Sequence, residues 1–274
     1  MFEKILKNVH EKTPLVHCIT NYVTVNDVAN AILACGASPI MADDLKEVEE
    51  ITSICNATYI NIGTLNERTV ESMIKAGKIA NSLNHPVILD PVGAGASKFR
   101  TDTTYRLLDE IKFSVIRGNI SEIKTIYTGS GKTKGVDADV SDRITEETLD
   151  EAVLFAKNMS KKLNSVIAIT GAIDIVADEN KAYVIRNGHP MMSKITGTGC
   201  MLSGIIAAFV AANMENKTEA VTAAITIMGL SGELGYKKIE ENNEGTSSFR
   251  TYLIDGISKM DIDTLKGGMK VEIK

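Results

Sequence analysis

The 274-residue sequence has no tryptophan, and aromatic residues make up only 5% of it. With so few rings, the stacking surfaces that bind single-stranded nucleic acids are not expected. Its 30 Lys and Arg against 35 Asp and Glu give a formal net charge of −5, and the basic residues form no cluster. Because a nucleic-acid site needs a basic patch, the composition predicts no nucleic-acid partner.

Long apolar runs are also missing. The longest one, Met201–Ala212, contains Ser203 and Gly204 and is shorter than the ~20 residues that cross a bilayer. It therefore predicts a buried helix and no membrane partner. Residues 1–12 mix both charges and lack the apolar centre of a signal peptide. We expect a cytoplasmic protein.

Cysteine is scarce, and the four present form no Cys-x-x-Cys pair: Cys18, Cys35, Cys55 and Cys200. In a cytosolic chain, separated thiols of this kind are expected to stay reduced. The four histidines have no ligand-like spacing to them, so a Cys/His metal centre is not predicted. Cys35 and Cys55 fall within apolar patterns and are expected in the core.

Short β-rich runs alternate with helical patterns along most of the chain. The predicted strands are Pro14–Thr20, Ser38–Ala42, Ala57–Gly63, His85–Asp90, Phe113–Arg117 and Ser165–Thr170. The predicted helices between them are Asn26–Cys35, Leu45–Ile54, Glu67–Leu83, Thr103–Ile111, Ser121–Tyr127 and Glu146–Leu163. This alternation predicts an α/β fold whose parallel sheet has helices on both faces.

The remaining patterns complete a single domain over residues 1–274. Ile173–Asp178 and Lys181–Arg186 flank Glu179-Asn180, and this arrangement predicts a hairpin at one edge of the sheet. Two Ala-rich helices are expected from Cys200 and from about Thr218. No linker, low-complexity segment or internal repeat divides the chain.

Polar residues follow several of the predicted strands. Asp90, Arg117 and Thr170 each end a predicted strand, and Asn119–Glu122 follow the strand that ends at Arg117. Since ligands bind outside the carboxyl ends of parallel strands, these residues are expected at one rim. Each alone has a plainer interpretation, such as a turn cap for Asp90, a surface pair for Arg117 or a helix cap for Glu122. Their joint placement favours a binding site.

The segment Ile195-Thr196-Gly197-Thr198-Gly199-Cys200 leads into the apolar run. Two glycines around a threonine at a helix start would aim several backbone N–H groups at one point, which suits a phosphate. A thiol beside a transferring phosphate could accept a proton from an attacking alcohol. A plain buried thiol remains the alternative for Cys200.

Two of these motifs resemble signatures of the ribokinase-like superfamily. Residues 196–200 resemble its Gly-x-Gly-Asp/Cys anion hole, and Asn119-Ile120-Ser121-Glu122 resembles its Asn-x-x-Glu magnesium motif. Most members have Asp where this chain has Cys200, and Cys is typical of the hydroxyethylthiazole kinase family. Further segments resemble that family over nearly the whole chain: residues 17–26, 38–42, 90–96 and 245–255.

The resemblance implies a ribokinase-like fold and phosphorylation of the hydroxyl of 4-methyl-5-(2-hydroxyethyl)thiazole by ATP, for thiamine biosynthesis or salvage. It further implies a homotrimer with active sites at the subunit interfaces. For the phosphoryl group, it implies an anion hole at Gly197, Thr198 and Gly199 and a catalytic Cys200. It implies Mg²⁺ at Asp90 and Glu122, and ATP at Arg117 and Thr170. The implied thiazole contacts are Met41, Gly197, Asn21 and Val23, the last two from a neighbouring subunit.

The role of Cys200 and the nature of the substrate leave alternatives. A helix start lowers a thiol pKa and a bound phosphate raises it, so Cys200 would be a weak base, which a loose transition state tolerates. Hydroxymethylpyrimidine or pyridoxal kinases, and ATP-dependent hydrate dehydratases, share the scaffold but would carry Asp at position 200. Residues 128–142, rich in Gly, Lys and Asp, are expected to be a surface loop or a lid.

Overall fold

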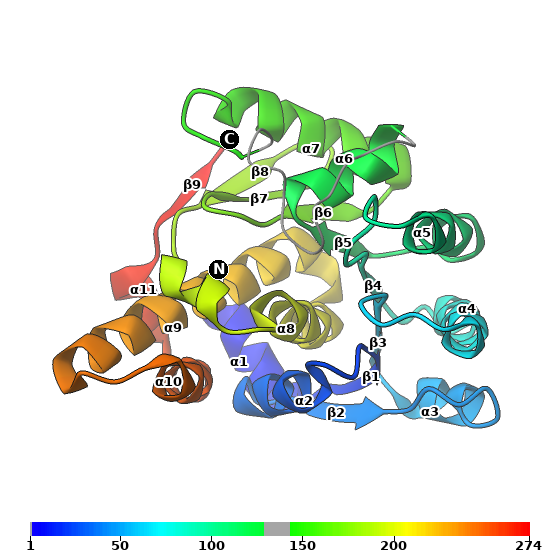
Figure 1. Cartoon of the computed structure of the whole chain (residues 1–274), viewed down its shortest axis with the longest axis horizontal. Helices are drawn as coiled ribbons and strands as arrows, with labels where there is room; N and C mark the ends of the chain where they lie inside the picture. The colour runs from blue at the N-terminus through cyan, green and yellow to red at the C-terminus, as the bar shows by residue number, and fades with distance from the viewer. Residues whose placement is uncertain (1, 129–142) are drawn as a thin grey trace.

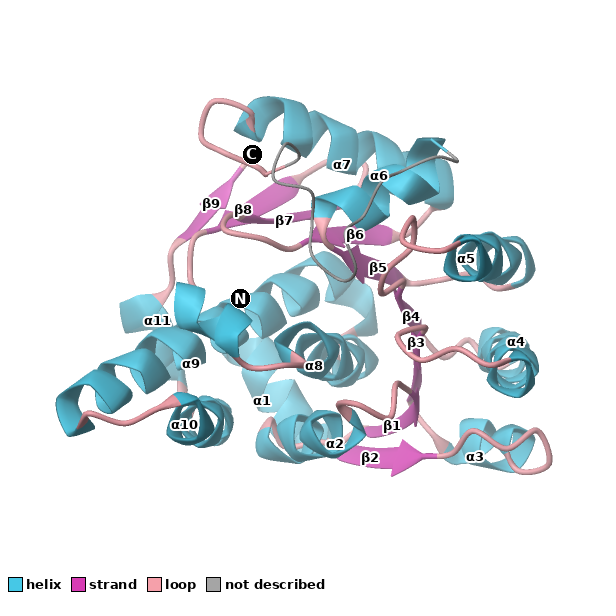
Figure 2. Ribbon diagram, in the orientation of Figure 1, coloured by secondary structure: helices cyan, strands magenta, loops and turns pink. Residues whose placement is uncertain are grey.

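The computed structural model describes residues 2–128 and 143–274, so the predicted loop or lid over 128–142 lies outside the described residues except for Thr128. In the described part, strands form one sheet in the order β2-β1-β3-β4-β5-β6-β7-β8-β9 (Figures 1 and 2). Their bounds are β1 Leu15–Ile19, β2 Ser38–Met41, β3 Ala57–Asn61, β4 Val87–Asp90, β5 Val115–Gly118, β6 Val166–Ile169, β7 Asp174–Ala177, β8 Ala182–Ile185 and β9 Val271–Ile273. Pairing is parallel from β2 to β6 and antiparallel from β6 to β9.

Helices connect the strands and cover both faces of the sheet, as the sequence predicted (Figure 2). Their bounds are α1 Phe2–Lys12, α2 Val25–Ala34, α3 Val48–Ile54, α4 Glu67–Ser82, α5 Lys98–Glu110, α6 Ile120–Thr128, α7 Leu149–Leu163, α8 Thr198–Ala212, α9 Lys217–Asn242, α10 Thr246–Ser258 and α11 Ile262–Gly268. Short 3₁₀ turns at Pro190–Lys194 and Met214–Asn216 flank α8.

Two apolar cores lie on opposite faces of the sheet. One is built from α1, α2, α8, α9, α10 and α11, and the other from α3 to α7. Central strands such as β3 and β4 are buried along their whole length, which is typical of parallel sheets with helices on both sides. Helix α8 is apolar on all sides and buried almost throughout, so it belongs to the core and not to the surface.

Three features of the fold differ from the sequence-based expectation. The β7–β8 hairpin does not form the edge of the sheet, because β9 pairs with β8 and takes that place. Helix α5 begins at Lys98, well before the predicted Thr103, because the Ser97 side chain accepts a hydrogen bond from the backbone N–H of Arg100 and caps the helix. Helices α1, α10 and α11 were not predicted, although α1 buries Ile5, Leu6 and Val9 on one face.

The parallel strands position the polar residues. Asn61 at the end of β3 is in register with Asp90 at the end of β4, and Gly118 of β5 is in register with Ile169 of β6. Thr170 directly follows Ile169, so these strand ends share one rim of the sheet. Within the described residues, no single helix is long and apolar enough to cross a membrane; α8 and the following helix pass such a test only as a pair bent by 116°.

Candidate functional site

The loop Gly197–Cys200 opens α8 at this rim. Gly197 is the N-cap in the left-handed region, with φ of 88°, and a Cβ there would lie 2.6 Å from Cγ2 of Thr24. Only glycine fits both constraints. The N–H groups of Thr198, Gly199 and Cys200 are in the first turn, where an α-helix supplies no acceptor and carries the positive end of its dipole. The predicted anion hole is therefore at a helix start.

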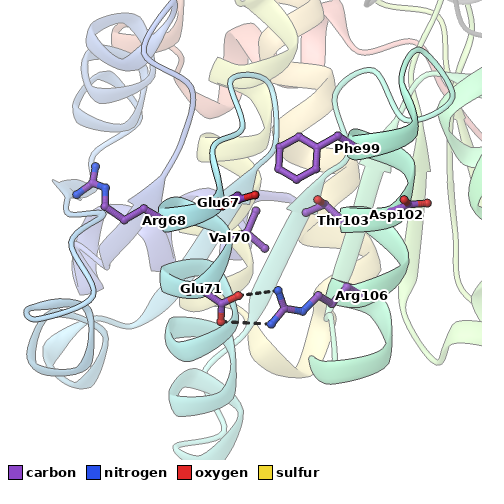
Figure 3. Close-up of a pocket in the computed structure, with 8 residues that line it drawn as sticks. All are labelled: Glu67, Arg68, Val70, Glu71, Phe99, Asp102, Thr103 and Arg106. Carbon is purple, nitrogen blue, oxygen red and sulfur yellow. Dashed lines mark hydrogen bonds and ion pairs between the residues drawn. The ribbon is translucent and has the colours of Figure 1, made fainter.

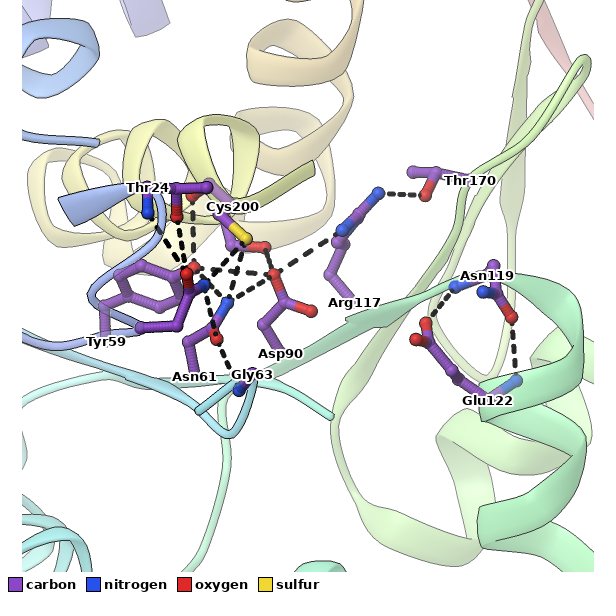
Figure 4. A network of polar contacts seen from close by, with 12 residues as sticks. Thr24, Tyr59, Asn61, Gly63, Asp90, Arg117, Asn119, Glu122, Thr170 and Cys200 are labelled. Carbon is purple, nitrogen blue, oxygen red and sulfur yellow. Dashed lines mark hydrogen bonds and ion pairs between the residues drawn. The ribbon is translucent and has the colours of Figure 1, made fainter. Parts of the chain in front are cut away.

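Arg117 lies against this loop. A Cβ on Gly199 would be 2.5 Å from Nη1 and 2.9 Å from Nη2 of Arg117, so glycine lets the guanidinium reach the loop. Nη2 of Arg117 donates to Oγ1 of Thr170, and Nη1 is 3.5 Å from Oδ2 of Asp90 (Figure 4). The two residues predicted to contact ATP are therefore bonded to each other beside the predicted anion hole.

Asp90 is completely buried, and its two carboxylate oxygens differ. Oδ2 accepts from Oγ of Ser203 at 2.8 Å and from Nδ2 of Asn61 at 3.2 Å, and it faces Arg117. Oδ1 is buried without a hydrogen-bond partner. Burial raises the pKa of Asp90, and the Arg117 charge opposes that rise. A buried carboxylate with one free oxygen is suited to a cation.

Glu122 stands in the first turn of α6 and is held by backbone groups. Oε1 accepts from the N–H of Gly93 and Oε2 from the N–H of Asn119, each at 2.8 Å, while Oδ1 of Asn119 accepts from the N–H of Glu122. Burial, together with the negative charge of Asp90, raises the pKa of Glu122 to about 7. Gly93 belongs to the loop after Asp90, so this loop connects the two carboxylates.

Both carboxylates fit a hard divalent cation such as Mg²⁺. Mg²⁺ takes oxygen ligands and is commonly held by one or two carboxylates, with waters and phosphate oxygens completing the shell. Asp90 offers a free oxygen, and a cation would favour the charged forms of two carboxylates whose pKa values burial raises. Within residues 2–128 and 143–274, no three His, Cys, Asp or Glu side chains converge, so waters and phosphate would complete the coordination.

Cys200 is 9% exposed and accepts hydrogen bonds at its sulfur. Nδ2 of Asn21 lies 3.2 Å from Sγ, and Nδ2 of Asn61 lies 3.3 Å from it. Burial, followed by the charge of Asp90, raises the pKa of the thiol, and hydrogen bonds from Thr24, Asn21 and Asn61 oppose this rise. The sequence left the direction of the shift open, and in the structure burial and Asp90 outweigh the stabilising donors.

Sequence reasoning missed three members of this cluster. The hydroxyl of Tyr59 accepts from Nδ2 of Asn61 at 2.8 Å and donates to the backbone oxygen of Cys200 at 3.1 Å. Asn61 and Ser203 both bond Asp90. The available signals were an amide side chain at the last position of a buried strand, and a hydroxyl three residues after Cys200 on the same face of an apolar helix.

The residues predicted to contact the thiazole are placed differently from one another. Asn21 is buried inside the cluster and contacts Cys200 of the same chain. Met41 ends β2 and is partly buried against the core that contains α8. Val23 lies in the β1–α2 loop with 60% of its surface exposed. Only Asn21 of these three joins the hydrogen-bonded cluster of the described residues.

A separate groove of about 540 Å³ lies between α4 and α5 on the outer side of the molecule (Figure 3). Its lining is Glu67, Arg68, Val70, Glu71, Phe99, Asp102, Thr103 and Arg106. Its charged groups are exposed, and two of them pair in the bidentate contact of Arg106 with Glu71. None of the residues predicted for the site lines this groove.

Known proteins resemble this chain over its whole length. A model of the hydroxyethylthiazole kinase family matches residues 6–263. A hydroxyethylthiazole kinase from Clostridium acetobutylicum is 60% identical over 272 residues, covering 99% of each chain. The solved structure of a hydroxyethylthiazole kinase protein from Pyrococcus horikoshii OT3 matches with a TM-score of 0.87 and 37% identity, covering 100% of this chain and 98% of that one.

A more distant structure supports the fold assignment. A ribokinase-like superfamily protein from Enterococcus faecalis V583 matches with a TM-score of 0.62 at 12% identity, covering 93% of this chain and 88% of that chain. These similarities confirm the predicted ribokinase-like fold. The family assignment rests on the match of the family model and of the Clostridium acetobutylicum relative over nearly the whole chain. This chain belongs to the hydroxyethylthiazole kinase family.

Proposed function

We propose that this protein transfers the γ-phosphoryl group of ATP to the hydroxyl of 4-methyl-5-(2-hydroxyethyl)thiazole, giving the thiazole phosphate used in thiamine biosynthesis or salvage. The observation that carries the proposal is the glycine loop of α8, with Arg117 against it and the free oxygen of Asp90 beside it, in a chain of this family. In the reaction a bond forms between the alcohol oxygen and the γ-phosphorus. The bond from that phosphorus to the β–γ bridging oxygen breaks, which releases ADP and one proton.

The loop would bind the phosphoryl group. Phosphoryl transfer needs in-line positioning and stabilisation of spread negative charge more than covalent help from the protein. The N–H groups of Gly197, Thr198, Gly199 and Cys200 at the start of α8 suit this demand, because preformed donors at a helix start need little reorganisation. Arg117 would add positive charge to the ATP phosphates, with Thr170 fixing its guanidinium.

Mg²⁺ would be held by Asp90 and Glu122. When bound, it would neutralise phosphate charge, which is the usual part that this ion plays in kinases. Asp90 would supply its free Oδ1, while Ser203 and Asn61 hold Oδ2 in place. Glu122 is held in place by two backbone N–H groups and would bind the same ion, directly or through water.

Cys200 would take the proton of the alcohol. Its sulfur accepts two amide N–H bonds, and these favour a thiolate, although the thiol pKa is raised by burial and by Asp90. A loose transition state keeps the alcohol protonated until late, so a base of this kind lowers the barrier only modestly. Met41, Gly197 and Val23 would line the thiazole site, and Asn21, which the sequence placed with them, would act through Cys200 of the same chain. We further propose a cytoplasmic homotrimer in which neighbouring subunits complete the site.

A coupled ADP-release assay with the thiazole alcohol, ATP and Mg²⁺ tests the proposal. We expect turnover with the thiazole alcohol and none with hydroxymethylpyrimidine or pyridoxal, and chelation of Mg²⁺ should abolish it. Turnover with one of the other alcohols alone would contradict the substrate assignment. ATP-dependent dehydration of a nicotinamide hydrate would contradict the reaction class. The solution mass of the purified protein tests the trimer.

A further inference from the structure

The amides of Asn21 and Asn61 both point their N–H groups at Sγ of Cys200. In a side-chain amide, nitrogen and oxygen have nearly the same shape, so the direction of each must be fixed by its partners. Both amides have a backbone N–H as one partner. A backbone N–H can only donate, and each therefore decides which end of its amide is oxygen.

Asn21 is fixed from the β1–α2 loop. Its Oδ1 accepts from the backbone N–H of Thr24 at 3.2 Å and from Oγ1 of Thr24 at 3.1 Å. This leaves Nδ2 facing Sγ of Cys200 at 3.2 Å and Oδ1 of Asn61 at 3.1 Å. Asn21 is 4% exposed, so water does not compete freely for these donors. The loop thus aims a donor at the sulfur.

Asn61 is fixed from the β3–α4 loop. Its Oδ1 accepts from the N–H of Gly63 at 2.9 Å and from Nδ2 of Asn21 at 3.1 Å (Figure 4). Its Nδ2 then faces the hydroxyl of Tyr59, Oδ2 of Asp90 and Sγ of Cys200 within 3.3 Å. Two hydrogens serve three acceptors there, so Asn61 shares its donors while Asn21 gives one hydrogen to sulfur and one to Asn61.

We propose that Asn21 and Asn61 form an amide clamp that holds Sγ of Cys200 as a hydrogen-bond acceptor beside the anion hole. Both are positioning residues that act through Cys200, and Asn61 is not among the residues that the sequence predicted for the site. Oγ1 of Thr24 gives its hydrogen to Oδ1 of Asn21, so a Cys200 thiolate that holds the two amide donors keeps one of its three lone pairs for a further donor, which in the reaction would be the hydroxyl of the substrate. The inference rests on the proposed kinase activity and specifies which neighbours prepare its base.

Asn21→Asp is the sharpest variant. The carboxylate keeps an oxygen for Thr24 and the size of the side chain, but it replaces the donor at Sγ by an acceptor. The thiol should then donate to the new carboxylate and lose its acceptor role, so kcat should fall about tenfold, the effect of one lost hydrogen bond, with the KM values for ATP and the thiazole alcohol within about twofold. Asn180→Asp, the same change in the exposed β7–β8 turn, is the matched control.

A double-mutant cycle separates the clamp from general damage. In a Cys200→Ala background, Asn21→Asp should change kcat less than about twofold, because the group through which it acts has gone. An equal loss in both backgrounds overturns the proposal, and so does a loss confined to the KM of the thiazole alcohol, since that would mean direct contact with substrate. Asn21→Ala, which only removes the donor, should give a smaller loss of the same kind and serves if Asn21→Asp fails to fold.

Alkylation of Cys200 gives a readout that needs no turnover. Iodoacetamide modification is followed by peptide mass across about pH 7–11 in the wild type, Asn21→Asp and Asn180→Asp, because the thiolate is the reacting form. The midpoint should move to higher pH in Asn21→Asp and stay in place in the control. An unchanged midpoint overturns the clamp even if the kinase activity is established. Failure of the wild type to phosphorylate the alcohol, with a shifted midpoint in Asn21→Asp, would overturn the proposed function alone.

Discussion

The Cys200 cluster and the α4–α5 groove show two ways of gathering polar groups in one molecule. In the groove, Arg106 and Glu71 are 46% and 51% exposed, and each finds its partner in the other (Figure 3). In the cluster, Asp90 is fully buried, and one of its carboxylate oxygens has no hydrogen-bond partner. Its other oxygen and Sγ of Cys200 both accept from Nδ2 of Asn61. The groove is a hollow lined by exposed groups, whereas the cluster holds a buried carboxylate oxygen without a hydrogen-bond partner.

This difference shows what marks a site in this fold. Exposed ion pairs contribute little, because water screens them and their side chains lose entropy on pairing. Buried groups that lack a partner cost free energy on folding, and such strain is kept where it serves a function. Variants in the cluster should therefore change activity more than stability, whereas variants in the groove should change neither by much.

Replacement of Asp90 by Asn should have the largest effect. The change keeps the shape but removes the charge that pairs Arg117 and would attract Mg²⁺, so kcat/KM should fall about a thousandfold, the upper end of the range for one electrostatic partner. Burial of the Asp90 charge opposes folding, but the same charge compensates the largely buried Arg117, so the unfolding temperature should change much less than the activity. A coupled assay and thermal unfolding measure the two effects. Loss of stability in parallel with activity would place Asp90 with the structural residues.

Changes at Cys200 should be milder. Cys200→Ala should lower kcat about tenfold while ATP binding persists, because a weak base contributes little to a loose transition state. Cys200→Asp should retain or increase kcat, since Asp is ionised at neutral pH. Steady-state kinetics and ATP titration provide the measurements. If Cys200→Asp folds normally but is inactive, the base assignment is wrong.

The pH dependence should follow from the raised thiol pKa. At neutral pH the thiol is mostly protonated, so a thiolate base becomes more abundant as pH rises, and kcat should increase about three- to tenfold from about pH 7 to about pH 9. Cys200→Ala keeps the titrations of ATP and Glu122 and is the control that should lose this rise. Superimposable profiles for the two proteins would show that another group is responsible.

The smallest effect is expected in the groove. Glu71→Gln removes the charge of an exposed pair, so kcat and both KM values should stay within experimental error and the unfolding temperature should move by no more than about 1 °C. Arg106→Gln is its counterpart from the other side of the pair. A marked loss of turnover in either variant would mean that the groove communicates with the site and that the two regions are not independent.

The sequence predicted more of the site's outline than of its interior. Asp90, Arg117 and Thr170 could be placed at one rim because each ends a predicted β-rich run, and the register of β3 to β6 brings those strand ends together. Tyr59 carried no such signal, because a tyrosine within an apolar strand is indistinguishable from a core residue until its hydroxyl is placed. Asn61 stood at a strand end, but its role depends on Asn21 and Gly63, and the contact with Asn21 exists only in the folded chain.

The peripheral elements β9 and α10 were not predicted, for a different reason. Strand β9 has three residues and follows Gly267-Gly268, so its sequence pattern is too short to distinguish from a turn. It becomes a strand because it pairs with β8. Helix α10 has apolar and polar residues with little periodicity, and it is held by packing on α9 and by the contact of Arg250 with Asp27 of α2. Such elements depend on partners remote in sequence.

Helix α8 belongs to both the site and the core, so the rigidity of the core extends to the site. The same helix would present its first amides to the phosphate, and it buries Ile205, Ile206 and Phe209 completely. The interior of this helix is buried and hydrogen-bonded, so its amide hydrogens beyond the first turn should be among the slowest to exchange with solvent, and they hold the unbonded first-turn amides in place. A bound phosphate would therefore meet donors that are rigid on the timescale of turnover, and a partly unfolded but active form of this protein is not expected.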